Sequence, residues 1–235
     1  MNPARGGRAA ALIATAALAL ALAATASGES GVPAPDPHRN LSTGPLPPAC
    51  ERAGASATCE RAAIAALDRA RAGMGLAPYR LPPRFTAMAP ARQWLILANL
   101  DRRAYAEEPI GGLASALDAV AKQAAASRAD PDPGPLLQAL HGQSVIGYAS
   151  NWAGGQANAL LAYFGWMYDD GYRSGNVACA TPSASGCWGH RHDIFAFPHG
   201  PVLTMGAAAV HPGRGPQASY ALTIVETSTR VWPHA

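Results

Sequence analysis

The order in which helix-like and strand-like segments follow one another most constrains the fold of this chain. The first half has apolar residues at helical spacing, whereas the last quarter has two strand-like runs, 202–210 and 219–225, separated by a loop rich in glycine and proline. Two runs joined in this way predict an antiparallel hairpin. Helices that precede such a hairpin favour an α/β fold, here a three-layer α/β/α sandwich with a mainly antiparallel sheet.

Apolar spacing predicts four helices and one more strand ahead of the hairpin. The helices are expected at 60–73, 90–105, 115–127 and 155–168, and the strand at 144–149. Pro90 suits the first turn of its helix, where the missing N–H costs no hydrogen bond. Gly73 is expected to end the first helix.

The N-terminus predicts export. Arg5 and Arg8 precede an apolar run over 9–23, and small residues follow at 24–26. This pattern is typical of a cleaved secretory signal. The alternative is a membrane anchor, but the run is shorter than the roughly 20 residues that a spanning helix needs. We therefore expect a signal peptide over 1–26, a secreted protein, and no transmembrane segment after cleavage.

The rest of the chain divides into a linker and one domain. Residues 27–58 are rich in Pro and Gly, so they predict a flexible or extended linker. Residues 59–229 are enough for a single domain with one core. The chain has 18 basic and 15 acidic side chains, and Arg5 and Arg8 leave with the signal. The nearly neutral remainder makes nucleic acid and anionic membrane surfaces poor partners.

Four cysteines in an exported chain predict disulfides. Their spacing favours two local bridges, Cys50 to Cys59 and Cys179 to Cys187, although four cysteines permit three pairings and the sequence does not choose among them. The alternative is a zinc site made by the second pair with His190 and His192. Its spacing lacks the paired cysteine knuckle of structural zinc sites, so the bridges are favoured.

Three motifs in the second half carry the strongest signal. They are Tyr148-Ala149-Ser150-Asn151-Trp152-Ala153-Gly154, Trp166-Met167-Tyr168-Asp169-Asp170-Gly171 and Gly186-Cys187-Trp188-Gly189-His190-Arg191-His192-Asp193-Ile194-Phe195. Together they resemble the signature of the CAP superfamily, the SCP-like extracellular domain of cysteine-rich secretory, antigen 5 and pathogenesis-related proteins. The chain resembles a divergent member of the bacterial type. The resemblance covers about 60–226 and implies the three-layer sandwich described above.

The resemblance also implies a cleft that two histidines and two glutamates line, and that can hold a divalent metal such as zinc. His190 matches one histidine. Ser150 stands where a glutamate is expected, and Asn151 keeps the neighbouring position. No glutamate occurs between Pro109 and Val225, so His190 is the one recognisable metal ligand.

Three interpretations of His190 remain open. A relocated metal site can be drawn from His190, Asp193 and Asp130 with Asp169 or Asp170, although so few ligands bind a metal weakly. A hydrolase can be drawn from Ser150 and His190 with an orienting aspartate, although no Gly-x-Ser-x-Gly elbow is present. The plainest interpretation is that His190 makes a structural hydrogen bond.

Aromatic residues gather around the same motifs. With nearby Asn, Asp and His they are typical of a shallow site for a glycan, a peptide or an apolar ligand. The expected cleft residues are His190, Ser150, Asn151, Trp188 and Asp193. We therefore expect a secreted, non-catalytic binding or interaction module for a cell-wall, lipid or protein ligand, with a metal-dependent or Ser/His hydrolase as the alternative.

Overall fold

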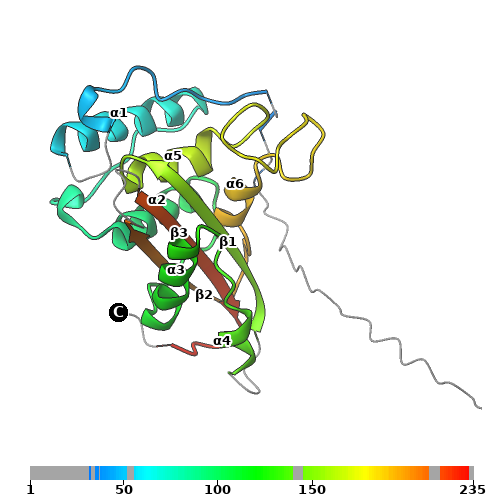
Figure 1. The fold of residues 1–235 in the computed structure, drawn as a ribbon. Coiled ribbons are helices and arrows are strands. Elements are labelled where there is room, and N and C mark those ends of the chain that lie inside the picture. Colours follow the sequence, from blue (N-terminus) through cyan, green and yellow to red (C-terminus); the bar gives the residue numbers. More distant parts are fainter. Residues whose placement is uncertain are drawn as a thin grey trace, which may run out of the picture.

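The structure is a computed structural model that describes residues 32, 35–36, 38–51, 56–139, 145–211 and 218–232 (Figure 1). The predicted signal peptide and most of the loop of the predicted hairpin lie outside the described residues. In the described part, no helix is both long and apolar enough to cross a membrane.

The chain forms a mixed α/β fold with an antiparallel sheet. In order, the elements are η1 (Pro48–Cys50), α1 (Ala57–Gly73), η2 (Phe85–Ala87), α2 (Pro90–Ala104), α3 (Ser115–Ser127), α4 (Gly134–Gln138), β1 (Val145–Gln156), α5 (Ala159–Tyr168), α6 (Gly189–Ile194), β2 (Val202–Val210) and β3 (Ala218–Thr227). The predicted helices and strands are all present. Two short helices, α4 and α6, were not predicted, and β1 extends into a stretch that the sequence assigned to a helix.

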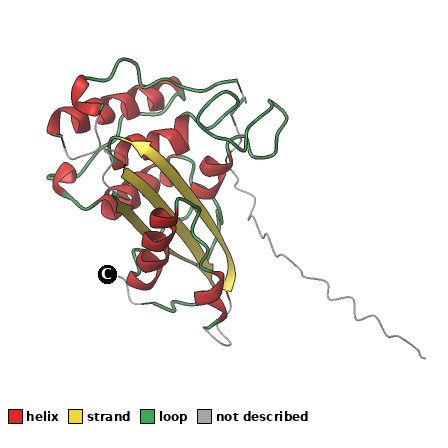
Figure 2. Ribbon diagram, viewed as in Figure 1, coloured by secondary structure: helices red, strands yellow, loops and turns green. Residues whose placement is uncertain are grey.

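The sheet has the strand order β1-β3-β2, and both pairings are antiparallel. β3 is therefore the central strand, and β1 lies at one edge (Figure 2). Asn151 of β1 is opposite Leu222, and Met205 of β2 is opposite Ile224. Outside the sheet, Leu113 makes an isolated parallel bridge to Met205.

β3 is buried along its whole length because helices cover both of its faces. Tyr220, Leu222 and Ile224 pack into the main core with residues of α1, α2 and α5. Ala221 and Val225, which alternate with them, pack against α3 instead. In Figure 1, α3 lies in front of the sheet, on the side that these alternate residues face. Side chains that alternate along a strand explain this division.

Gly206 allows α3 to approach the sheet closely. A Cβ added at this glycine would lie 2.2 Å from the backbone carbonyl carbon of Leu117. The neighbouring Asp118 accepts a hydrogen bond from the backbone N–H of Ala207 at 2.8 Å. The helix is therefore fixed to β2 by both shape and a polar contact.

A buried carboxylate ties three helices together on the other face. Asp101 of α2 is fully buried, pairs with Arg71 of α1, and accepts hydrogen bonds at 2.6 Å from the hydroxyls of Tyr79 and Tyr163. Burial raises the pKa of Asp101, whereas the tyrosine hydrogen bonds and the charge of Arg71 oppose that shift. The buried carboxylate of Asp101 keeps its ion pair and hydrogen bonds only while these helices stay packed together.

Residues 38–51, within the predicted linker, differ from expectation because they pack on the domain. The backbone N–H of Leu41 donates to the carbonyl of Tyr168 at 2.8 Å, and the Asn40 side chain donates to the carbonyl of Tyr172 at 2.7 Å. The disulfide between Cys50 and Cys59 joins this segment to α1. These two hydrogen bonds and the disulfide hold in place a segment whose composition alone predicts a linker.

Candidate functional site

A cavity of about 630 Å³ opens beside the edge strand β1. Its walls come from five places: the end of β1 around Trp152, the start of β3 with Ser219, the segment after α3 with Asp130, the side of α5 with Gly165, and the loop that follows α5. His190, at the first turn of α6, completes the lining. We call this cavity the cleft.

Asp170 fixes α6 and the His190 ring at the cleft. Its carboxylate is almost fully buried, and it accepts hydrogen bonds from the backbone N–H of His190 at 2.9 Å and from that of Arg191 at 3.4 Å. Nδ1 of His190 lies 2.6 Å from the same carboxylate. About a quarter of the His190 side chain is exposed, and in the described part of the chain its Nε2 has no hydrogen-bond partner. The ring therefore has a set orientation and one available nitrogen.

The groups around His190 influence one another electrostatically. Burial alone would lower the pKa of His190, but the hydrogen bond and charge of Asp170, with the charges of Asp130 and Asp193, raise it overall. Burial raises the pKa of Asp193 to about 7, against the opposing charge of His190. Desolvation also raises the pKa of Asp130, against the charge of His190 and the backbone of Trp152. The pKa values of all three groups are therefore raised, and strongly shifted groups of this kind gather at functional sites.

Asn151 supports α6 from the sheet. It is fully buried in β1, and its Nδ2 donates to the backbone carbonyl of His190 at 2.8 Å, while its Oδ1 has no partner among the described residues. Asn151 therefore holds His190 in place from behind and does not itself line the cleft.

Ser150 lies on the other face of β1, because consecutive strand residues point in opposite directions. Its hydroxyl donates to that of Thr223 at 2.8 Å. Trp188 is 2% exposed, packs against the Cys179–Cys187 disulfide, and donates from Nε1 to the carbonyl of Asp36. Neither residue lines the cleft, and nor does Asp193. Of the five expected cleft residues, His190 alone does so.

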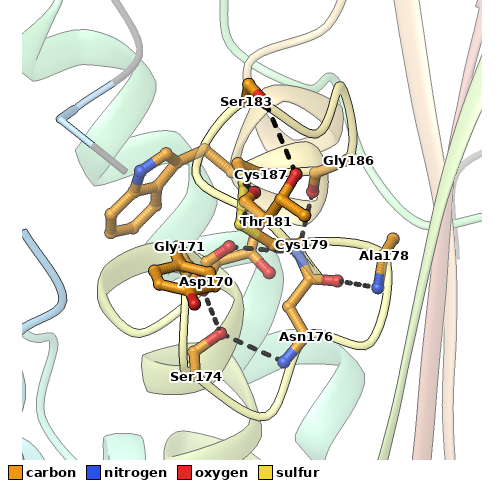
Figure 3. Close-up of a disulfide and its surroundings, with 12 residues drawn as sticks. Asp170, Gly171, Ser174, Asn176, Ala178, Cys179, Thr181, Ser183, Gly186 and Cys187 are labelled. Atoms are coloured by element: carbon orange, nitrogen blue, oxygen red, sulfur yellow. Dashed lines mark hydrogen bonds between the residues drawn. A yellow bond between two sulfur atoms is a disulfide. The ribbon is translucent and has the colours of Figure 1, made fainter. Parts of the chain in front are cut away.

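The loop between α5 and α6 forms the wall opposite β1. The disulfide between Cys179 and Cys187 closes it, and Figure 3 shows Asn176 at its centre. Nδ2 of Asn176 donates to the carbonyls of Asp170 at 3.0 Å and Gly186 at 2.8 Å, and Oδ1 accepts from the N–H of Ala178 at 2.9 Å. One buried amide thus joins both ends of the loop. Sequence reasoning did not identify Asn176, since nothing local marks its partners.

The family-type metal site does not fit the residues present. Among the described residues, no three His, Cys, Asp or Glu side chains come together so that they could hold a metal ion. Both oxygens of Asp170 already accept hydrogen bonds from α6, which leaves it poorly placed as a ligand. We therefore assign no chemistry to a metal here.

The chain was compared with protein-family models, with curated proteins and with solved structures, and none of these comparisons found a match.

Proposed function

We propose that this chain is a secreted CAP-like domain that binds an extracellular ligand in the cleft, without catalysing a reaction on it. The cleft is the observation that carries the proposal, because its volume falls within the 300–1,000 Å³ of typical ligand sites. It combines the aromatic residue Trp152 and the apolar residues Ala162 and Val177 with the polar residues His190, Asp130 and Asp169. A mainly apolar wall with a few polar groups is the usual composition of such a site.

Three observations support the CAP-like part of the proposal. Helices pack on both faces of an antiparallel sheet, as a three-layer sandwich requires. The histidine that matches the family motif lines the cleft. Two disulfides, Cys50–Cys59 and Cys179–Cys187, are typical of a chain that folds in an oxidising compartment, which supports secretion.

A hydrolase is the second candidate, and the Asp170–His190 pair favours it because a carboxylate orients the base in such enzymes. The nucleophile is the weak point. Ser150 does not line the cleft, and its hydroxyl is bonded to that of Thr223. Ser219 does line it, but its hydroxyl donates to the carbonyl of Ala125 at 2.6 Å and accepts from Trp152 Nε1 at 2.7 Å. Binding without catalysis is therefore the better proposal.

The test fills the cleft from Gly165. A Cβ added at this cleft-lining glycine meets no atom within 4 Å, so the side chain of Gly165→Phe enters open space. The mature protein is incubated with purified peptidoglycan sacculi and, separately, with vesicles of phosphatidylcholine and phosphatidylglycerol, and retention is measured. We expect retention on one of the two and at least a tenfold loss in Gly165→Phe.

The control is Ala119→Phe, which adds the same side chain at an exposed position of α3, outside the cleft. It should be retained like the wild type, and both variants should keep the wild-type melting temperature to within a few degrees. Retention on neither material, or equal retention of both variants, contradicts a ligand site in the cleft.

A further inference from the structure

Exposed apolar side chains continue from the cleft along β1. The large apolar side chains that are exposed in the described part of the chain are Ile146, Tyr148 and Val177, at 48%, 39% and 93%. Val177 belongs to the cleft wall, and the other two lie at the opposite end of β1. Two of the three therefore lie on β1, and the third lies in the wall of the cleft, which the other end of β1 also lines.

Tyr148 and Trp152 share one face of β1, because they are an even number of residues apart in a regular part of the strand, whereas Ile146 lies at a register shift. α3 lies on the same side of the sheet, chiefly over β2 and β3 (Figure 1), and packs on β1 at Trp152, whereas the Tyr148 side chain stays exposed. Trp152 is half-buried and reaches the cleft, with its indole lying over Gly154. From Ile146 to Gly154 the strand spans about 26 Å at roughly 3.3 Å per residue.

Carboxylates flank this face. The Tyr148 hydroxyl donates to Asp132 at 3.2 Å, and the Trp152 backbone stabilises the charged form of Asp130. No cation lies within ion-pair distance of either carboxylate in the described residues, so both are available as hydrogen-bond acceptors. A ligand that lies along β1 therefore needs apolar surface for the rings and donor groups for the aspartates.

We propose that the exposed face of β1 extends the cleft into a linear site for an uncharged polysaccharide chain. Sugar rings have an apolar C–H face that packs on aromatic rings, and hydroxyl groups that donate to carboxylates. Tyr148 and Trp152 supply two such rings about 13 Å apart. Asp130 and Asp132 accept from the hydroxyls and repel polyanions.

Other ligands fit this surface less well. An extended peptide pairs with the backbone at a strand edge, but the exposed groups here lie on the face of β1, and the Trp152 carbonyl already accepts from Trp166 Nε1 at 3.1 Å. A lipid tail needs continuous apolar surface, which Ser150 and the two aspartates interrupt. The inference rests on the proposed function, since the cleft forms one end of the site.

The test is titration calorimetry with uncharged β-1,4-linked N-acetylglucosamine oligomers from the dimer to the hexamer. We expect wild-type affinity to rise at least tenfold with chain length. Tyr148→Ala should bind the dimer like the wild type and lose most of the gain for the hexamer, whereas Tyr148→Phe, which keeps the ring, should retain most of it. Gly165→Phe should bind neither the dimer nor the hexamer.

The outcomes separate the two proposals. Equal affinity for every length, or a length dependence that Tyr148→Ala leaves unchanged, overturns the linear site while the cleft remains a ligand site. Binding of vesicles or of a lysine-rich peptide but of no oligomer overturns the choice of polysaccharide. A far-UV spectrum and melting temperature like those of the wild type show that Tyr148→Ala is folded.

Discussion

Asp170 shows how one buried side chain organises the site. Its carboxylate accepts from two backbone N–H groups of α6 and from the His190 ring, and its own backbone carbonyl accepts from Asn176 and Trp188. Because those contacts leave its oxygens occupied, Asp170 positions the base rather than binding a ligand. The ligand-facing chemistry falls to Nε2 of His190 and to the aspartates farther out.

The raised pKa of Asp193 predicts that the stability of the protein depends on pH. Its pKa is raised from an ordinary 3.8 to about 7, so folding disfavours its ionised form. A raised carboxyl pKa gives a stability contribution that is complete below about pH 4 and is lost as the pH rises towards 7. Asp193→Asn cannot ionise, so we expect it to lose less stability than the wild type between pH 5 and pH 7.5, measured by urea unfolding.

His190 acts in the same direction, because its raised pKa stabilises the protein at low pH and that contribution disappears as the pH rises through the folded value. The remaining slope in Asp193→Asn is therefore expected from His190 together with the other carboxyls whose pKa burial raises, Asp130, Asp169 and Asp170. Glu51→Gln, which removes an exposed acid, is the control and should match the wild type. Identical slopes for Asp193→Asn and the wild type would show that this carboxyl is not perturbed.

At the scale of elements, apolar spacing was a good guide to α1, α2 and α3, because each buries one continuous stripe. It failed for α6, whose six residues carry no such stripe and depend on Asp170, a residue distant in sequence. It also cut β1 short. Gly154 and Gly155 indicate a turn, yet the strand continues through a register shift there, with the indole of Trp152 over Gly154.

The contact between α3 and β2 gives a second prediction. Because the added methyl of Gly206→Ala would meet backbone rather than a flexible side chain, α3 must move, and overpacking of this kind costs about 1–3 kcal/mol. We expect the free energy of unfolding, from urea titration, to fall by about that amount.

Gly165→Ala is the matched control. The new methyl meets no atom within 4 Å, and alanine is favoured over glycine inside a helix by about 0.5–1 kcal/mol. This variant should be at least as stable as the wild type. A Gly206→Ala protein that is as stable as Gly165→Ala would mean that α3 does not pack so closely.

At the scale of the whole molecule, the sequence located the site only in part. His190 was identified because its motif is specific, and the spacing favoured the two disulfides that the structure contains without excluding the other pairings. Trp188 was misplaced because a tryptophan beside a histidine looks like a ligand contact, whereas here it fills the space next to Cys179–Cys187. Ser150 is on the same face of β1 as Trp152 but does not line the cleft, and its hydroxyl is bonded instead to Thr223 of β3, a partner 73 residues away that the sequence alone does not reveal.

Removing the disulfide Cys179–Cys187 is expected to weaken binding, whereas removing Cys50–Cys59 is not. Cys179→Ala/Cys187→Ala removes a short closed loop, which costs about 2–3 kcal/mol of stability, and releases the cleft wall that Asn176 and Val177 form. We expect this variant to remain folded at 20 °C but to lose retention on the material that holds the wild type.

Cys50→Ala/Cys59→Ala provides the comparison, because it opens a loop of similar length whose described residues do not line the cleft. Its stability loss should be similar and its retention unchanged. If both pairs weaken retention equally, the effect comes from stability alone, and the loop between α5 and α6 has no special part in the cleft.

The buried Asp101 has a consequence for how the molecule opens. Its partners are Arg71 of α1, Tyr79 in the segment after α1, and Tyr163 of α5, so removing Arg71 leaves a buried charge without its counter-ion, and removing a tyrosine takes away one of its hydrogen bonds. None of α1, α2 and α5 can detach while the other two stay in place. Their amide protons should then exchange with solvent through one shared event, as a single cooperative unit.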